Sequence, residues 1–526
     1  GIGTYVKSSR QTHAECGDKA NDSVRVNGTQ LRCKVVSEGG NLGCTQPGRI
    51  EYALHGGRCN TDFIDNSAGV DCSDHEVNIK IALNALVASG DMTEKQRREL
   101  LSSMTDAVAE LVLQHNYRQT QALSLAERQA LVRSGEYERL IKRMESSGRL
   151  QRALEFIPDD ETLLERKADG RGLTRPELAV LISYTKAQLK ADLVVPAIAD
   201  DPLLSQALYR AFPEQLCTSY RAVLDQHRLR APIIGTQIAN DMIDLMGITF
   251  VERMVQSTGA SAVEVARAFV TAREVFDMHN HWRAIEALDG RIDANVQLDM
   301  MAVVMRLVRR ATRWFIRNRR VHLQPSREVE RFRQPIAELH RQYPEILAGR
   351  VLEDYSARRQ RLLEQAVPPD VAEYVAAANF LYPSLSIIDA ATEVDKPVRK
   401  VAEVYVALAQ ALELDSFAKQ IADLKVENHW QAQARETFRD DLEWQQRKLA
   451  VGALLHLCPQ GDVPACLQRW LKQQQTLVER WRALLMELHG TEAKEFAVFA
   501  VAIRELLDLA QSTYHGAAPD LVAPAE

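Results

Sequence analysis

The sequence predicts a mixed fold, in which a partial α/β, Rossmann-like domain is followed by a large all-α region. Up to about residue 88 the chain contains short β-branched runs interrupted by many glycines and asparagines, which is typical of strands that end in loops. Beyond that point β-rich runs almost vanish, and long stretches carry apolar residues at the spacing of amphipathic helices.

This change of pattern divides the chain into four expected segments. Residues 1–88 would form the distal part of a nucleotide-binding domain, 89–172 a helical connector, 173–515 an all-α carboxyl-terminal domain, and 516–526 a disordered tail. The turn-rich stretch 158–172 marks the end of the connector, and the tail is rich in alanine and proline.

The composition indicates a soluble protein with a large core. Of 526 residues, 46% are hydrophobic and 26% are charged, and the net charge of −6 gives no general attraction to nucleic acid or anionic lipid. No apolar run approaches the roughly 18 residues that cross a bilayer, and the first thirty residues lack the apolar core of a signal peptide. We therefore expect a cytoplasmic protein that binds neither nucleic acid nor a membrane.

A first candidate loop follows the run 33–36, which reads as a short buried strand. In open α/β sheets a ligand lies beyond the carboxyl ends of the strands. Gly39 and Gly40 would let the backbone approach such a ligand, and the amide of Asn41 can both donate and accept a hydrogen bond.

A second candidate loop spans residues 61–70 and contains Asn66. It leads to Ser73, which we interpret as the N-cap of a helix, with Glu76 completing a capping box. The apolar face expected for that helix contains Val77, Ile81 and Ala85.

The two loops resemble the coenzyme domain of amino-acid dehydrogenases of the glutamate dehydrogenase group, whose patterns are E-G-A-N-x-P-T-T and N-A-G-G-V-x-x-S-x-x-E. The first pattern is matched by Glu38, Gly39, Gly40, Asn41 and Thr45, and the second by Asn66, Ser67, Ala68, Gly69, Val70, Ser73 and Glu76. The chain is most similar to the large bacterial NAD-specific members, in the runs GIGTYVK, EGGNLGCTQPGRIEYA, GGRCNTDFIDNSAGVDCSDHEVN and RGLTRPELAVLISYTK.

The resemblance implies oxidative deamination of L-glutamate to 2-oxoglutarate and ammonia with NAD, carried out by a homo-oligomer. It assigns Gly39, Gly40, Asn41 and Asn66 to the coenzyme, and Ser73 to the distal carboxylate of glutamate. The catalytic lysine and aspartate of the family belong to motifs that are not found here. We therefore expect the acid and base to lie upstream of Gly1, and we expect the 526-residue chain alone to be inactive.

Two alternatives remain open. The segment could be a non-catalytic helical interaction module with a vestigial dehydrogenase remnant, or it could belong to a relative that acts on another amino acid.

Three other groups of residues have ordinary structural interpretations. Five of the eight cysteines lie in the first 72 residues without a C-x-x-C pair, so we predict reduced thiols packed in a core and no metal site. His279 and His281 are interpreted as polar structural residues. The seven arginines in 306–320 are interpreted as the basic face of an amphipathic helix, either solvated or paired with acidic neighbours such as Glu328 and Glu330.

The helical region offers clear local signals. Thr93 and Thr174 should cap helices, the latter with Glu177 in a capping box. The helix after Thr174 should bury Leu178, Leu181, Ile182 and Leu189, and the expected packing anchors further on are Trp430, Trp444, Trp470 and Trp481.

Overall fold

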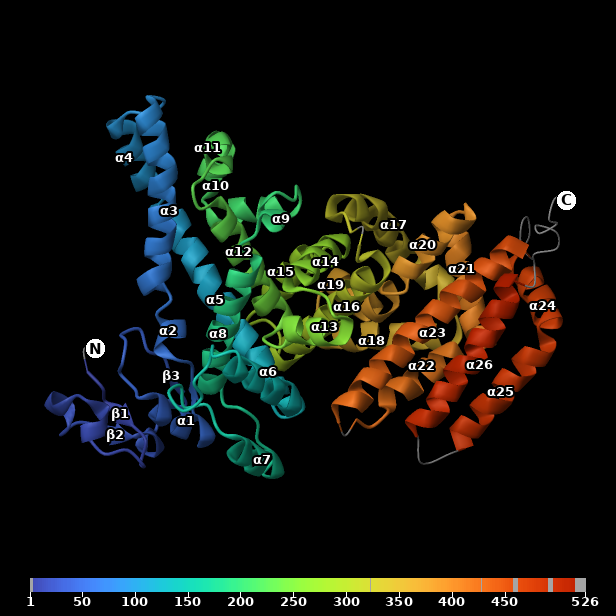
Figure 1. The fold of residues 1–526 in the computed structure, drawn as a ribbon, viewed down its shortest axis with the longest axis horizontal. Coiled ribbons are helices and arrows are strands. Elements are labelled where there is room, and N and C mark those ends of the chain that lie inside the picture. Colours follow the sequence, from blue (N-terminus) through green and yellow to red (C-terminus); the bar gives the residue numbers. More distant parts are fainter. Residues whose placement is uncertain (1–2, 322, 427, 457–461, 491–494, 516–526) are drawn as a thin grey trace. The chain divides into compact units, whose positions relative to one another are not determined.

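The computed structural model describes residues 3–321, 323–426, 428–456, 462–490 and 495–515 (Figure 1). They divide into two units, Gly1–Thr271 with Thr312–Ser326, and Ala272–Ala311 with Arg327–Glu526. Helices α14 (Ala262–Val275) and α16 (Ala294–Arg319) contribute residues to both units. The boundaries expected at residues 88 and 172 stay predictions, and the tail 516–526 lies outside the described residues.

The predicted Rossmann-like part of the fold is wrong. The structure is 75% helical and only 2% strand, so the described residues contain no α/β domain, although the predicted all-α region is present. The strands are β1 (Val6–Lys7), β2 (Val26–Asn27), β3 (Val35–Val36) and β4 (Arg58–Cys59). They form two separate parallel pairs, β1 with β2 and β3 with β4.

Exposure explains why these strands stay short. A parallel sheet is stable when both of its faces are covered. Val26 is 36% exposed and Val35 is 63% exposed, so among the described residues one face of β2 and one face of β3 are incompletely covered. The run 33–36, expected to be a buried strand, is therefore reduced to the two residues of β3.

The first unit is built around helix α12. Its shorter 3-10 helices are η1 (Ala14–Cys16), η2 (Lys19–Asn21), η3 (Gly28–Gln30) and η4 (Leu204–Ala211). Its α-helices are α1 (Gln46–Leu54), α2 (Asp62–Asp65), α3 (Ala68–Ser89), α4 (Glu94–Ser103), α5 (Thr105–Gln129), α6 (Ser134–Ser146), α7 (Asp160–Ala168), α8 (Arg175–Leu193), α9 (Pro196–Ala199), α10 (Glu214–Ser219), α11 (Arg221–Asp225), α12 (Arg230–Met246) and α13 (Phe250–Thr258). Helix α12 packs against α8, α5, α9 and η4, and its Ile234, Ile238, Met242 and Ile243 are fully buried.

The predicted start and buried face of α8 are confirmed. Thr174 caps the helix with Glu177 in a capping box, and Leu178, Leu181, Ile182 and Leu189 are all buried. Thr93 caps α4 in the same way, with Gln96 as its partner.

The predicted start and buried face of α3 are wrong. The helix begins at Ala68, and it buries His75, Ile79, Ala82 and Leu83. Val77, which we expected inside, is 52% exposed, and Ala85 is exposed as well. Because α3 packs against α5, the contact between the two helices decides which face is buried.

The second unit consists of helices. They are α15 (Met278–Glu286), α17 (Pro325–Ile346), α18 (Gly349–Glu364), α19 (Pro369–Leu381), α20 (Ser384–Val394), α21 (Val398–Ala411), α22 (Leu414–Asp423), α23 (His429–His456), α24 (Val463–Gln473), α25 (Gln475–Gly490) and α26 (Phe496–His515). Helices α23 and α26 pack along each other, as the orange and red ribbons in Figure 1 show.

Two of the four predicted tryptophan anchors are confirmed. Trp470 and Trp481 are fully buried, and their indole N–H groups donate to Thr513 Oγ1 at 3.1 Å and to the Leu412 carbonyl at 2.8 Å. The other two are not anchors, since Trp430 is 75% exposed and Trp444 is 42% exposed.

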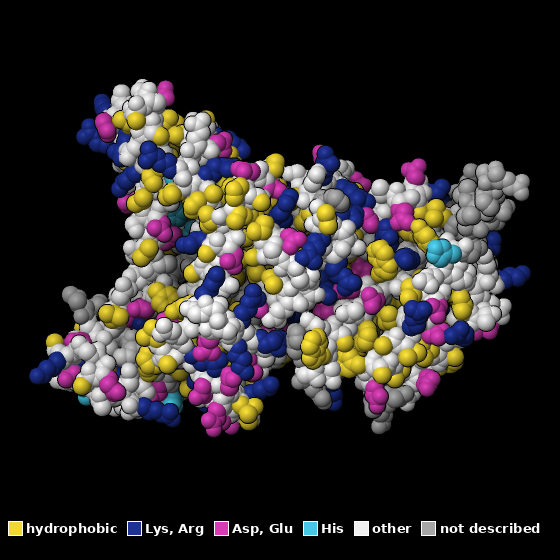
Figure 2. All heavy atoms as spheres, viewed as in Figure 1, with side chains coloured by type: hydrophobic (Ala, Val, Ile, Leu, Met, Phe, Trp, Pro, Cys, Tyr) yellow, Lys and Arg dark blue, Asp and Glu magenta, His cyan; other side chains and the backbone are white. Residues whose placement is uncertain are grey.

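His281 packs within the second unit, and the arginines 306–320 are only partly solvated, since Arg306, Arg317 and Arg320 are exposed whereas Arg313 is 8% exposed. The ring of His281 stacks on Tyr374 with centroids 3.3 Å apart, and burial lowers the pKa of His281 to about 4. The Arg310 guanidinium lies 3.8 Å from the ring centre of Tyr382. Figure 2 shows basic and acidic side chains interspersed over the displayed face.

Within the described ranges, no single helix is both long and apolar enough to cross a membrane. One bent pair, α19 with α20 at 58°, satisfies those criteria of length and composition together.

Candidate functional site

The two predicted loops leave the same edge of the β3–β4 pair. The strands are parallel, with Val35 opposite Arg58 and Val36 opposite Cys59, so both chains continue in the same direction. Beyond them, Nδ2 of Asn66 donates to Oδ1 of Asn41 at 3.1 Å. The structure therefore brings together two of the residues that the sequence assigned to one site.

A buried carboxylate shapes the glycine loop. One oxygen of Glu38 accepts from the backbone N–H groups of Gly43 and Cys44, the second of these at 3.3 Å. The backbone N–H of Leu42 donates to Asp62 at 3.1 Å, and the Leu42 carbonyl accepts from the Thr4 hydroxyl at 2.8 Å. These bonds hold Leu42 at φ +68°, a conformation that is rare for a bulky residue.

Arg49 of α1 connects the two loops. Its side chain is only 7% exposed, and Nη2 lies 2.6 Å from Glu38 in the first loop and 3.4 Å from Asp62 in the second. Asp65 adds a further connection, because it accepts from the backbone N–H of Glu38 at 2.9 Å. One buried cation between two carboxylates thus fixes the relative position of the loops.

The second segment is more regular than the predicted loop 61–70. Helix α2 occupies its first half, Asn66 is the C-cap of α2, and α3 begins two residues later. Asn116 of α5 donates to the Ile64 carbonyl at 2.7 Å and to the Ser67 hydroxyl at 3.1 Å. The connection between α2 and α3 is therefore anchored on α5.

The two predicted glycines lie at the open side of the site. Gly39 is exposed and Gly40 is half-buried. A Cβ atom added at Gly39 would meet nothing within 4 Å, so packing within the described chain does not demand glycine there. Asn41 is exposed beside them.

Ser73 is not an N-cap, and the predicted capping box does not form. Ser73 lies inside α3, where its hydroxyl donates to the Val70 carbonyl at 2.7 Å, while Glu76 pairs with Lys80 at 3.2 Å. The Ser73 side chain is exposed. Its role toward a substrate carboxylate stays a prediction.

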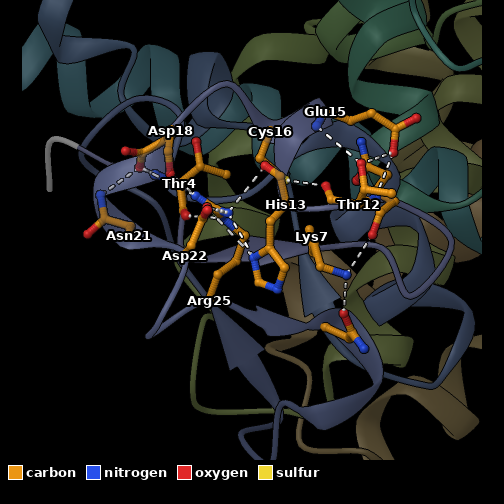
Figure 3. Close-up of polar contacts among 12 residues, drawn as sticks. Thr4, Lys7, Thr12, His13, Glu15, Cys16, Asp18, Asn21, Asp22 and Arg25 are labelled. Atoms are coloured by element: carbon orange, nitrogen blue, oxygen red, sulfur yellow. Dashed lines mark hydrogen bonds and ion pairs between the residues drawn. The ribbon is translucent and has the colours of Figure 1, made fainter.

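A polar cluster in the amino-terminal segment supports the glycine loop (Figure 3). The buried Arg25 donates to the Thr4 carbonyl at 2.8 Å and contacts His13 Nδ1 at 3.0 Å. Nζ of the buried Lys7 donates to the Ser8 and Gln11 carbonyls and to the Asn27 side chain. All three donors of Lys7 are used, so we assign this lysine a structural role.

Cys44 and Cys59 are poor candidates for a nucleophile. Burial raises the pKa of the Cys44 and Cys59 thiols to about 12, so both are protonated at neutral pH. The five amino-terminal cysteines are reduced as predicted, but only Cys59 is buried, and Cys33 is exposed. Cys466 in α24 is disulfide-bonded, contrary to the predicted reduced state.

The structure also reveals a cluster that sequence reasoning missed. Asp71 and His75 of α3 lie beside His115 of α5, and their ligand atoms are all within 4.8 Å of one another. The spacing of Asp71 and His75 by one helical turn was visible in the sequence. Nothing in the sequence related either residue to the distant His115.

Comparisons with known proteins cover nearly the whole chain. Residues 170–508 match the family model described as glutamate dehydrogenase, C-terminal, and residues 1–126 match that of the bacterial NAD-glutamate dehydrogenase catalytic domain.

Three similar proteins all carry the name NAD-specific glutamate dehydrogenase. The one from Pseudomonas aeruginosa is 52% identical over 516 residues, which is 98% of this chain and 32% of the relative. Those from Halomonas elongata and Mycobacterium tuberculosis are 48% and 34% identical, over 97% and 98% of this chain and again 32% of each relative. The chain thus spans about a third of the length of these relatives.

Proposed function

The chain belongs to the bacterial NAD-specific glutamate dehydrogenase family, and from this premise we propose that the complete protein oxidises L-glutamate with NAD. The reaction removes a hydride from the α-carbon of glutamate, for which NAD would be the acceptor when bound, and a proton from the amine. Hydrolysis of the resulting imine would release 2-oxoglutarate and ammonia. In this proposal residues of this chain contribute to coenzyme binding, and none of them is assigned as the catalytic acid or base.

The contact between Asn41 and Asn66 is the observation that carries this proposal. The hydrogen bond uses the amide nitrogen of Asn66 and the amide oxygen of Asn41. The remaining polar atoms, Asn66 Oδ1 and Asn41 Nδ2, have no hydrogen-bond partner among the described residues. The free acceptor and the free donor complement a carboxamide, which both donates and accepts. The residues present therefore fit the nicotinamide carboxamide, and NAD would supply the hydride acceptor when bound.

Asn66→Ala in the complete protein should reduce transition-state stabilisation by about 1–3 kcal/mol, the usual cost of losing a buried hydrogen-bonding partner. Steady-state kcat/KM for NAD gives this value directly. Asn84→Ala provides a matched control, because Asn84 is an exposed asparagine on the following helix α3. An unchanged kcat/KM in Asn66→Ala would exclude the coenzyme role.

A double-mutant cycle tests whether the two asparagines act together. Because Asn41 and Asn66 share a hydrogen bond, the effects of Asn41→Ala and Asn66→Ala should not add. Additive losses would show that each contacts the coenzyme separately.

Ser73→Ala should raise the KM for glutamate more than the KM for NAD. The hydroxyl is exposed on α3 and is free to turn from the Val70 carbonyl toward a substrate carboxylate. Kinetics with each substrate varied in turn measure the two constants. Since the hydroxyl caps no helix, Tm should change little, and normal kinetics would remove Ser73 from the site.

Experiments on the complete protein also test the two alternatives to this function. If the segment is only a helical interaction module, calorimetric NAD binding to the complete protein will not change in Asn41→Ala or Asn66→Ala. If the enzyme acts on another amino acid, a substrate panel will show a preference other than glutamate.

The homo-oligomeric assembly and the cytoplasmic location expected from the sequence stay predictions. Light scattering on the complete protein and fractionation of cells test them respectively.

A further inference from the structure

Asp71, His75 and His115 form a compact ligand set within the first unit. Asp71 Oδ2 lies 2.9 Å from His115 Nδ1, and Asp71 Oδ1 lies 3.7 Å from His75 Nε2. The two imidazole rings are stacked with their centroids 5.5 Å apart. One aspartate carboxylate thus faces two imidazoles at the contact between α3 and α5.

The hydrogen bonds of His75 fix its tautomer. Its Nδ1 lies 2.9 Å from the carbonyl oxygen of Ala211, and because a carbonyl only accepts, Nδ1 must carry a proton. When the ring is neutral, Nε2 therefore presents a lone pair. His75 is only 5% exposed, and its Nε2 has no hydrogen-bond partner among the described residues.

A bare lone pair facing a carboxylate oxygen is unfavourable unless a proton or a metal cation lies between them, and at 3.7 Å the two atoms are too far apart to share a proton in a hydrogen bond. We propose that Asp71, His75 and His115 bind one divalent transition-metal cation of the zinc or cobalt type. Imidazole nitrogens suit these metals, whereas magnesium and calcium prefer oxygen ligands. The Ala211 carbonyl then orients the His75 ring, as a backbone acceptor does for many metal-binding histidines.

The ligand set opens on a cavity that can complete the coordination. The cavity has a volume of about 220 Å³ and is also lined by Asp74, Asn78, Lys190, Gln237 and Asn240. This volume holds several water molecules. Two carboxylates against one lysine give the lining an excess of negative charge, which favours a cation.

This site is distinct from the proposed substrate contact. Asp71 and His75 lie on one face of α3, while Ser73 lies between them in sequence and is exposed on the opposite face. The cation would link α3 to α5 beside Asn116, which holds the connection between α2 and α3. We therefore assign it a structural role in stabilising the second loop, and the metal-binding test below does not depend on the proposed function.

Cobalt binding tests the proposal. The complete protein is stripped with EDTA, and bound Co²⁺ is measured by equilibrium dialysis and visible absorption. Wild type should bind one more equivalent of Co²⁺ than His115→Asn, with a d–d spectrum that Zn²⁺ abolishes. Since changing an outer partner alone typically lowers metal affinity 10–100-fold, removing a ligand should lower it by more than about 100-fold.

His55→Asn is the matched control, because His55 is an exposed histidine outside the cluster. It should bind Co²⁺ like wild type, and Asp71→Asn should reproduce the loss seen in His115→Asn. Equal stoichiometry and affinity in wild type and His115→Asn would overturn the proposal. So would a wild-type protein that binds no Co²⁺ at an equimolar concentration, whether or not the variants fold.

Discussion

Arg49→Met is expected to lower the free energy of unfolding by about 3–5 kcal/mol, because it removes one partner of a buried ion pair and leaves the other charge uncompensated. Glu38 and Asp62 are the carboxylates that would lose their cationic partner, and their side chains are only 10% and 15% exposed. Since Arg49 connects the two loops, the variant should also weaken NAD binding by the complete protein more than Asn66→Ala does.

Urea unfolding and calorimetric NAD titration measure the two effects. Arg504→Met serves as the control, because Arg504 forms an exposed pair with Asp508 at 3.5 Å, and such pairs contribute about 0–1 kcal/mol. If Arg49→Met proved as stable as Arg504→Met, the connecting role of Arg49 would be wrong.

Glu443→Gln is expected to stabilise the protein at pH 8 by about 3 kcal/mol while changing little at pH 4. Glu443 of α23 is buried, and burial raises the pKa of its carboxyl to about 7, despite the opposing effect of Arg310. The Ser386 hydroxyl donates to it at 2.9 Å, a hydrogen bond that glutamine can also accept.

The sign follows from proton linkage. The pKa of Glu443 is higher in the folded state than the value of about 4.3 in an unfolded chain, so folding favours the protonated carboxyl. The resulting stability is complete below about pH 4.3 and is lost as the pH rises through 7. Glutamine stays neutral throughout, so the variant should not lose stability over this range.

Tryptophan fluorescence during urea unfolding at several pH values measures this change, since Trp470 and Trp481 are buried in the same unit. Glu76→Gln is the control, because Glu76 forms an exposed pair with Lys80 and should leave the pH dependence unchanged. A Glu443→Gln variant that lost stability with pH in parallel with wild type would contradict the prediction.

The site was predictable where its residues stand in motifs of recognisable spacing. Asn41 and Asn66 were recognised from motif spacing, and the structure joins them by a hydrogen bond. The part of the site that escaped prediction depends on contacts that no motif spacing encodes. Arg49 was not recognised as the link between the loops, and His115 was not related to Asp71 and His75.

The sequence by itself determined the family, the start of α8 and the buried face of that helix. The capping box of Thr174 and Glu177 joins residues three apart. The apolar face of α8 is so wide that the buried side of the helix could be predicted from the sequence. Such local patterns are readable because backbone geometry alone brings the residues together.

Only the tertiary structure decided which face of α3 is buried, where Ser73 lies within this helix and how short β3 is. In α3 apolar residues point to more than one side, and the contact with α5 selects the face of His75 and Ile79 over that of Val77. The β-branched run 33–36 favours a strand locally, but with Val35 63% exposed and only β4 beside it, it pairs through two residues. In both cases the outcome depends on burial against distant segments, which local propensity does not encode.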